Sequence, residues 1–134
     1  MPADMKAFNA QLIAEYRANG GKLSGQMAGM NPLLLTTTGA KSFAERTVVV
    51  GWRPYGAAVA VIASNNGADK APLWFANLQA NPVATVEVGG EKFKVKARVA
   101  EGQERSEVAK LIDYYERQQA LTSREIPIVV LERV

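Results

Sequence analysis

The sequence predicts an α+β fold that is mainly β, with antiparallel strands in a closed or half-closed barrel and helices packed around it. Three observations predict this fold class. The 134 residues are the length of one ordinary domain, and 48% of them are apolar, which is enough for a substantial core. Short runs rich in β-branched residues are separated by Gly, Pro and Asn turns. The connections between these runs are short, which favours antiparallel pairing. We therefore expect a single domain over residues 1–134.

Three helices are predicted beside the strands. An amphipathic helix over residues 3–19, within an N-terminal segment 1–21, has apolar side chains at three- and four-residue spacing. A short helix begins after Pro72 and stops before Pro82. The third helix covers residues 103–119, and its apolar side carries Val108, Leu111, Ile112 and Tyr115.

Six strands are predicted between the helices. They span residues 32–38, 46–53, 57–64, 83–88, 92–99 and 126–131. The simplest pairing for the second and third is a hairpin with a turn at Pro54-Tyr55-Gly56. The fifth strand alternates basic and apolar residues, which indicates that one of its faces is exposed to solvent.

The chain contains no cysteine and no histidine, and this limits its chemistry. Thiol catalysis, the usual zinc sites and every histidine-based triad are excluded, so we expect no metal site. An acid–base step would have to use Tyr, Asp, Glu, Lys, water or the substrate. The net charge of +3 favours a mildly basic surface over nucleic-acid binding and would also suit a small anionic ligand. No run is apolar and long enough for a transmembrane helix, and no signal peptide is expected.

Two polar clusters are candidates for a ligand site. The first runs from Thr36 through Gly39 to Ser42 and includes Lys41, with Arg46 close behind. Hydroxyl groups, backbone N–H groups of the turn and two cations can hold an anion. A threonine-rich edge strand followed by a surface turn explains the same residues, and the pattern alone leaves both interpretations open.

The second cluster begins at Ser64 and continues to Trp74 and Asn77. A strand end followed by a polar loop and a helix start is a common place for a planar or anionic ligand. On pattern alone, packing explains Trp74 better. Tyr114 and Tyr115 must point in different directions on a helix. Tyr115 is on the apolar side, either as a core aromatic or with its hydroxyl in a pocket.

Taken in order, three segments resemble a known family. These are LLLTTTGAKS with a following arginine, ASNNGADKAPLWFANLQANP, and TSREIPIVVLE. Together they resemble the deazaflavin (coenzyme F-420)-dependent nitroreductases, small reductases of actinobacteria with a split β-barrel of the FMN-binding type. The resemblance runs from about residue 27 to the C-terminus.

The resemblance implies a cofactor, reduced 8-hydroxy-5-deazaflavin with a polyglutamate tail, and the residues that bind it. The tail would be held by Leu35, Thr36, Ala40, Lys41, Ser42 and Arg46. The ring would be bordered by Val61, Ile62, Ala63, Ser64, Asn65, Trp74 and Asn77. Tyr115 and Ser64 would be the catalytic residues, which donate a proton to the product or polarise its carbonyl group.

The sequence departs from the family pattern at several positions. Phe43 stands where relatives often have a glycine, and Glu45 where they often have a proline. Val49-Val50-Gly51 replaces a run that often contains proline and tyrosine, and Asn65 replaces a lysine. On the last helix, Tyr115 aligns with a pocket tyrosine of the family.

The resemblance implies a reductase that transfers a hydride to a small, planar, electron-poor acceptor such as an α,β-unsaturated ester or coumarin-like lactone, an enone or a quinone. Two alternatives stay open: a non-catalytic deazaflavin-binding protein, and an FMN-dependent reductase with the same barrel. We expect a cytoplasmic monomer or weak dimer with no nucleic-acid partner. We also expect no stable membrane insertion, with peripheral membrane contact left open.

Overall fold

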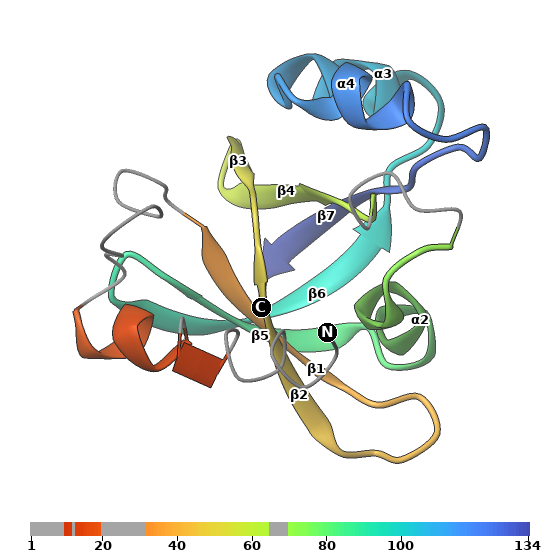
Figure 1. The fold of residues 1–134 in the computed structure, drawn as a ribbon. Coiled ribbons are helices and arrows are strands. Elements are labelled where there is room, and N and C mark those ends of the chain that lie inside the picture. Colours follow the sequence, from red (N-terminus) through yellow and green to blue (C-terminus); the bar gives the residue numbers. More distant parts are fainter. Residues whose placement is uncertain (1–9, 12, 20–31, 65–69) are drawn as a thin grey trace.

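Seven strands form one sheet in which every neighbouring pair is antiparallel, in the order β2-β1-β5-β6-β7-β4-β3 (Figure 1). The computed structural model describes residues 10–11, 13–19, 32–64 and 70–134. The strands are β1 (Leu33–Thr38), β2 (Glu45–Val50), β3 (Arg53–Tyr55), β4 (Ala58–Ile62), β5 (Val83–Val88), β6 (Glu91–Val99) and β7 (Ile128–Arg133). The helices are α2 (Leu73–Ala80), α3 (Gly102–Leu111) and α4 (Tyr115–Gln119). The predicted α+β class is confirmed.

The sheet is open, so the half-closed barrel is the correct one of the two predicted forms. Its edge strands β2 and β3 are consecutive in the chain and are joined by Gly51 and Trp52 alone. The prediction of one strand over residues 46–53 is therefore wrong, because β2 pairs with β1 whereas β3 pairs with β4. A glycine permits the sharp bend that such a barrel corner needs. The predicted hairpin exists between β3 and β4, where Arg53 lies opposite Ala60.

Strand β4 and the first four residues of β7 are buried on both faces, which explains why these stretches are continuously apolar. On one face, Val61 and Val129 pack with Trp74 of α2 in a cluster that we call the barrel core. On the other face, Ile62 and Val130 pack beneath α3 and α4 in a second cluster, the helix core. Figure 1 shows α3 and α4 together above β3, β4 and β7, with α2 beside the other end of the barrel.

The helix predicted over residues 3–19 is present at residues 10–11 and 13–18 and ends in a turn at residue 19, and the other residues of the prediction lie outside the described ones. Tyr16 fixes this helix against the outer face of β1. Its ring packs against Leu34, and its hydroxyl donates a 2.8 Å hydrogen bond to the carbonyl oxygen of Pro32. Arg17 forms an ion pair with Glu87 of β5 at 2.8 Å.

The single helix predicted over residues 103–119 is wrong, because the chain leaves the helical path after Leu111 and re-enters it at Tyr115. At the break, Ile112 is fully buried in the helix core whereas Leu111 is 46% exposed. The intervening Asp113 forms an ion pair with Arg53 of β3. The burial of Ile112 and the ion pair of Asp113 therefore outweigh the helical periodicity of the sequence. The side chains after the break point in other directions than they would on a continuous helix.

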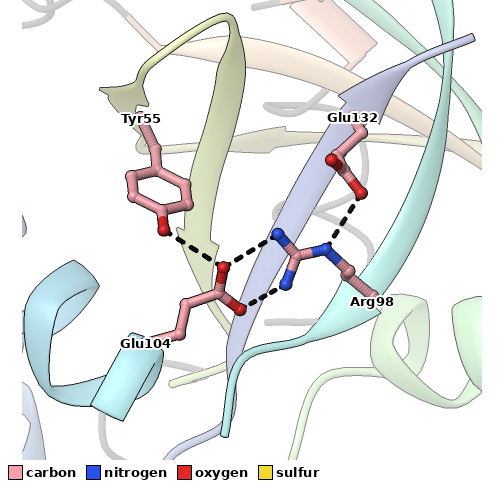
Figure 2. A network of polar contacts seen from close by, with 4 residues as sticks. All are labelled: Tyr55, Arg98, Glu104 and Glu132. Carbon is pink, nitrogen blue, oxygen red and sulfur yellow. Dashed lines mark hydrogen bonds and ion pairs between the residues drawn. The ribbon is translucent and has the colours of Figure 1, made fainter.

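A polar network attaches α3 to the sheet (Figure 2). The hydroxyl of Tyr55 donates to Glu104 at 3.1 Å, and Arg98 bonds to both Glu104 and Glu132. The hydrogen bonds from Arg98 lower the pKa of the Glu104 carboxyl group, and the bond to Glu104 raises the pKa of Tyr55. Among the described residues, no helix is long and apolar enough to cross a membrane.

Candidate functional site

A cavity of about 270 Å³ lies at the corner where the chain passes from β2 to β3. It is bounded by the ends of β2 and β4, the start of α2, Tyr114 just before α4, and Gln118 within α4. The lining residues are Val49, Val50, Gly51, Ile62, Ser64, Pro72, Trp74, Tyr114 and Gln118. We call this space the corner cavity. It lies between the barrel core and the helix core, so its walls are already rigid.

Two polar atoms in the wall of the corner cavity have no hydrogen-bond partner among the described residues. They are the hydroxyl oxygen of Tyr114 and the side-chain carbonyl oxygen Oε1 of Gln118, and both are buried. A buried polar atom without a partner is destabilising by about 1–3 kcal/mol. Because native proteins seldom leave such atoms unpaired, we expect a bound water or a ligand to complete this site.

Tyr114 is held in place by its neighbours at the barrel corner. The guanidinium of Arg53 lies 4.9 Å from the centre of its ring and is itself bonded to Asp113 at 2.9 Å. A Cβ atom at Gly51 would come within 3.3 Å of the Tyr114 hydroxyl oxygen, so the absence of a side chain there makes room for this hydroxyl. Burial raises the pKa of Tyr114, while the charge of Arg53 opposes the shift and that of Asp113 adds to it.

The loop between β1 and β2 carries the other predicted cluster, and Asn77 of α2 fixes its shape. The amide of Asn77 accepts a bond from the backbone N–H of Ala40 and donates one to Thr37 Oγ1, both at 3.1 Å. A Cβ atom at Gly39 would lie 2.5 Å from Ser42 Oγ and 3.2 Å from the carbonyl oxygen of Ala44, so glycine leaves room for this turn. Both polar ends of the Asn77 side chain are thus bonded within the protein.

Phe43 adopts a left-handed backbone conformation in the same loop, with φ of 60°, and its side chain is 72% exposed. For a residue with a bulky side chain this conformation is unfavourable by about 1–2 kcal/mol. The departure noted in the sequence, a phenylalanine where relatives often have glycine, therefore falls at the position where glycine would be favoured.

Lys41 and Arg46 are exposed, and their side chains form no hydrogen bond or ion pair with the part of the chain that the structure describes. Arg46 lies opposite Thr37 in the β1–β2 register. Side chains alternate along a strand, so Arg46 shares its face with Val50, which lines the corner cavity. At about 3.3 Å per residue, the two lie about 13 Å apart along β2.

The structure brings the residues predicted for the cofactor into two groups. Ile62, Ser64 and Trp74 line the corner cavity. Ala40, Lys41 and Ser42 form the β1–β2 loop, with Asn77 and Arg46 beside it.

Other predicted positions do not present their side chains to either group. Leu35, Val61 and Ala63 are fully buried in the barrel core. Thr36 lies on the opposite face from Leu35, where its hydroxyl bonds to that of Thr47 at 2.7 Å. Asn65 lies outside the described residues.

Tyr115, predicted as a catalytic residue, is not among the residues that line the corner cavity. Its hydroxyl bonds to Arg105 and to Gln119. Tyr114 occupies the cavity wall instead, because the break before α4 rotates the two tyrosines away from their expected directions. Sequence reasoning gave no role to Gly51 or Gln118. The two adjacent tyrosines were a signal for a pocket residue, but the choice between them needs the position of the break.

The chain is similar to known proteins over most of its length. A family model described as F-420H(2)-dependent quinone reductase matches residues 10–133. An F-420H(2)-dependent quinone reductase of Mycobacterium tuberculosis is 36% identical over 129 residues, which cover 90% of this chain and 86% of the relative.

Two solved structures are similar over much of the chain. One, described as an F-420-H2-dependent reductase, has a TM-score of 0.67 and 34% identity, covering 75% of this chain and 93% of the other. The second, described as a domain-swapped dimer, has a TM-score of 0.69 and 30% identity, covering 98% of this chain and 100% of the other.

Proposed function

Since the chain belongs to the family of F-420H(2)-dependent quinone reductases, a family of oxidoreductases, we propose that it transfers a hydride from reduced F-420 to an electron-poor carbonyl acceptor. The observation that supports this most directly is the corner cavity, in which two buried polar atoms lack partners among the described residues. Acceptors of this class include quinones, enones and α,β-unsaturated esters or lactones, all of which present a conjugated carbonyl oxygen.

The residues present fit the cofactor in two respects. The lining of the corner cavity combines apolar side chains, including Trp74, with the polar groups of Ser64, Tyr114 and Gln118, which suits a planar ring with polar edges. Lys41 in the β1–β2 loop and Arg46, about 13 Å from Val50 along β2, supply two cations, which suits a long anionic tail. These two residues would hold the tail, and the walls formed by Ser64 and Trp74 would border the ring.

The reduced deazaflavin, when bound, supplies the hydride. The protein must stabilise the negative charge that then develops on the carbonyl oxygen of the acceptor. A donor already directed into the cavity stabilises such charge without reorganisation. We assign this role to Tyr114, because the residue lines the cavity, its buried hydroxyl has no partner among the described residues, and burial raises its pKa. The anion formed by hydride transfer then takes up one proton, from Ser64 or from solvent, to give the neutral product.

The role of Tyr115 as the catalytic tyrosine stays a prediction, and its hydroxyl already has two partners. For this reason we assign the donor role to Tyr114. We also propose that the chain is a cytoplasmic monomer or weak dimer that binds no nucleic acid, as expected from the sequence.

The test is to mix the purified protein with reduced F-420 and a panel of quinones, enones and coumarin-type lactones, and to follow the cofactor's absorbance. Oxidation that depends on both protein and acceptor is the expected result. Binding of the cofactor without oxidation across the whole panel would replace the reductase with a non-catalytic binder. A protein that does not bind F-420 but is purified yellow would indicate FMN and refute the proposal.

A further inference from the structure

We infer that Arg124 is a positioning residue for the corner cavity: its guanidinium holds together the two chain segments that form one wall, and so sets the affinity for the cofactor. Arg124 precedes β7 and is not among the residues that line the cavity. The inference rests on the proposed function, because it concerns how the wall of the cofactor site is kept in place.

The contacts of Arg124 connect two parts of the chain. Its Nη2 atom donates to the carbonyl oxygens of Ala63 at 3.1 Å and Ser64 at 2.9 Å, just beyond the end of β4. It also lies 3.4 Å from the carbonyl oxygen of Lys70, on the approach to α2. Ser64 lines the corner cavity, and Pro72 and Trp74, which follow Lys70, line it too.

These bonds explain why β4 is shorter than the strand predicted over residues 57–64. Its ladder with β7 ends at Ile62, and the next two carbonyl groups turn to the guanidinium instead of to a strand. Hydrogen bonds from a charged donor are stronger than neutral ones. One side chain thus replaces the missing ladder and fixes the backbone at Ser64.

Arg124 is held in turn by a network that includes Tyr115. Gln119 donates to the Arg124 carbonyl oxygen at 2.6 Å and accepts a bond from the backbone N–H of Ile126 at 2.9 Å. The hydroxyl of Tyr115 donates to the same Gln119 at 3.2 Å and accepts a bond from Arg105. The Tyr115 hydroxyl therefore acts on the site through Gln119 and Arg124.

A residue of this kind changes the fraction of molecules in which the cavity wall has the conformation that binds the cofactor. If only a fraction of molecules hold the wall correctly, the apparent dissociation constant rises in inverse proportion to that fraction. Loss of the guanidinium bonds that leaves about one tenth of the molecules competent would raise Kd about tenfold. Turnover at saturating cofactor and acceptor should stay unchanged, because Arg124 contributes no group to the cavity.

The test compares Arg124→Gln with Arg117→Gln, a matched change at an exposed arginine of α4. Cofactor Kd is measured by fluorescence titration without turnover, and kcat at saturation and Tm are measured alongside. We expect Kd to rise about tenfold in Arg124→Gln with kcat unchanged, and no change in Arg117→Gln. A lower kcat with unchanged Kd would mean that Arg124 only maintains the folded fraction, and would overturn the inference.

Two further variants keep the test decisive if Arg124→Gln does not fold. Arg124→Lys keeps the charge but reaches fewer carbonyl groups, so its Kd should lie between the wild-type and expected Gln values. Tyr115→Phe should raise Kd by a smaller factor, and wild-type Kd in both variants would refute the network. If the wild-type protein itself does not bind F-420, the proposed function fails. If the wild type binds and the Arg124 variants bind equally well, only this inference fails.

Discussion

Replacing Tyr114 with phenylalanine should stabilise the protein while it impairs catalysis. The substitution removes a buried hydroxyl that has no partner among the described residues and leaves the ring under Arg53. Removing a buried polar group that has no partner should add about 1 kcal/mol to the free energy of unfolding. For a domain of this length that corresponds to a rise in Tm of about 3–5 °C.

The neighbouring substitution, Tyr115→Phe, is the matched control and should have the opposite sign. It removes the same oxygen atom from a side chain that bonds to Arg105 and Gln119. Two lost hydrogen bonds at a partly buried position should lower the free energy of unfolding by about 1–2 kcal/mol. Two chemically identical changes at adjacent positions thus separate a ligand-directed hydroxyl from a structural one.

The two variants should also differ in catalytic activity. Loss of a donor aimed at developing negative charge lowers kcat by about 10²–10³-fold in enzymes where it has been removed. Tyr114→Phe should therefore lower kcat strongly with a carbonyl acceptor and leave cofactor Kd near the wild-type value. Tyr115→Phe should leave kcat at saturation unchanged. Thermal melts of both variants measure Tm, and steady-state kinetics measure kcat. A destabilised Tyr114→Phe protein with wild-type kcat would refute the assignment of the cavity hydroxyl.

Three other predictions concern the β1–β2 loop and the network on α3. The double variant Lys41→Ala/Arg46→Ala should raise cofactor Kd roughly tenfold or more with little change in Tm, since both side chains are exposed; fluorescence titration measures this. Phe43→Gly should increase the free energy of unfolding by about 0.5–1 kcal/mol, because glycine tolerates φ of 60° but adds entropy to the unfolded chain; urea denaturation measures this. The lowered pKa of Glu104 predicts a stability contribution that is present above the unfolded carboxyl pKa of about 4.5 and is lost as the pH falls through the folded value. Arg98→Gln should flatten that part of the stability–pH profile, as denaturation from pH 3 to 7 would show.

Much of the fold could be predicted because its signals are local. The strand β5 has the predicted bounds, since turn residues flank it on both sides. The two errors share a physical cause. The bend at Gly51 depends on Tyr114, which is distant in sequence, and the break after Leu111 depends on the burial of Ile112 and on Arg53. Periodicity cannot register contacts between elements, so it extended both segments through their interruptions.

The candidate site was predictable in outline for a different reason. The family and its cofactor followed from two motifs in order, and both predictions are confirmed. The roles of single residues depend on side-chain direction, and there the pattern was insufficient. Asn77 was expected at the cofactor but uses both ends of its amide to hold the β1–β2 loop. Arg124 stood within a quoted motif, yet its bonds to Ala63 and Ser64 become visible only in three dimensions.

The position of α2 connects the two parts of the proposed site. Trp74 lines the corner cavity, and Asn77, three residues later and about 4.5 Å further along the helix axis, fixes the loop that carries Lys41. A small acceptor alone would have no use for cations outside the cavity, such as Arg46, which lies about 13 Å along β2 from Val50 in the cavity wall. A rigid helix that spans both places supports a single long ligand with a planar ring and an anionic tail. The acceptor would then contact mainly α4, so changes at Tyr114 or Gln118 should alter acceptor preference while cofactor binding by the loop is retained.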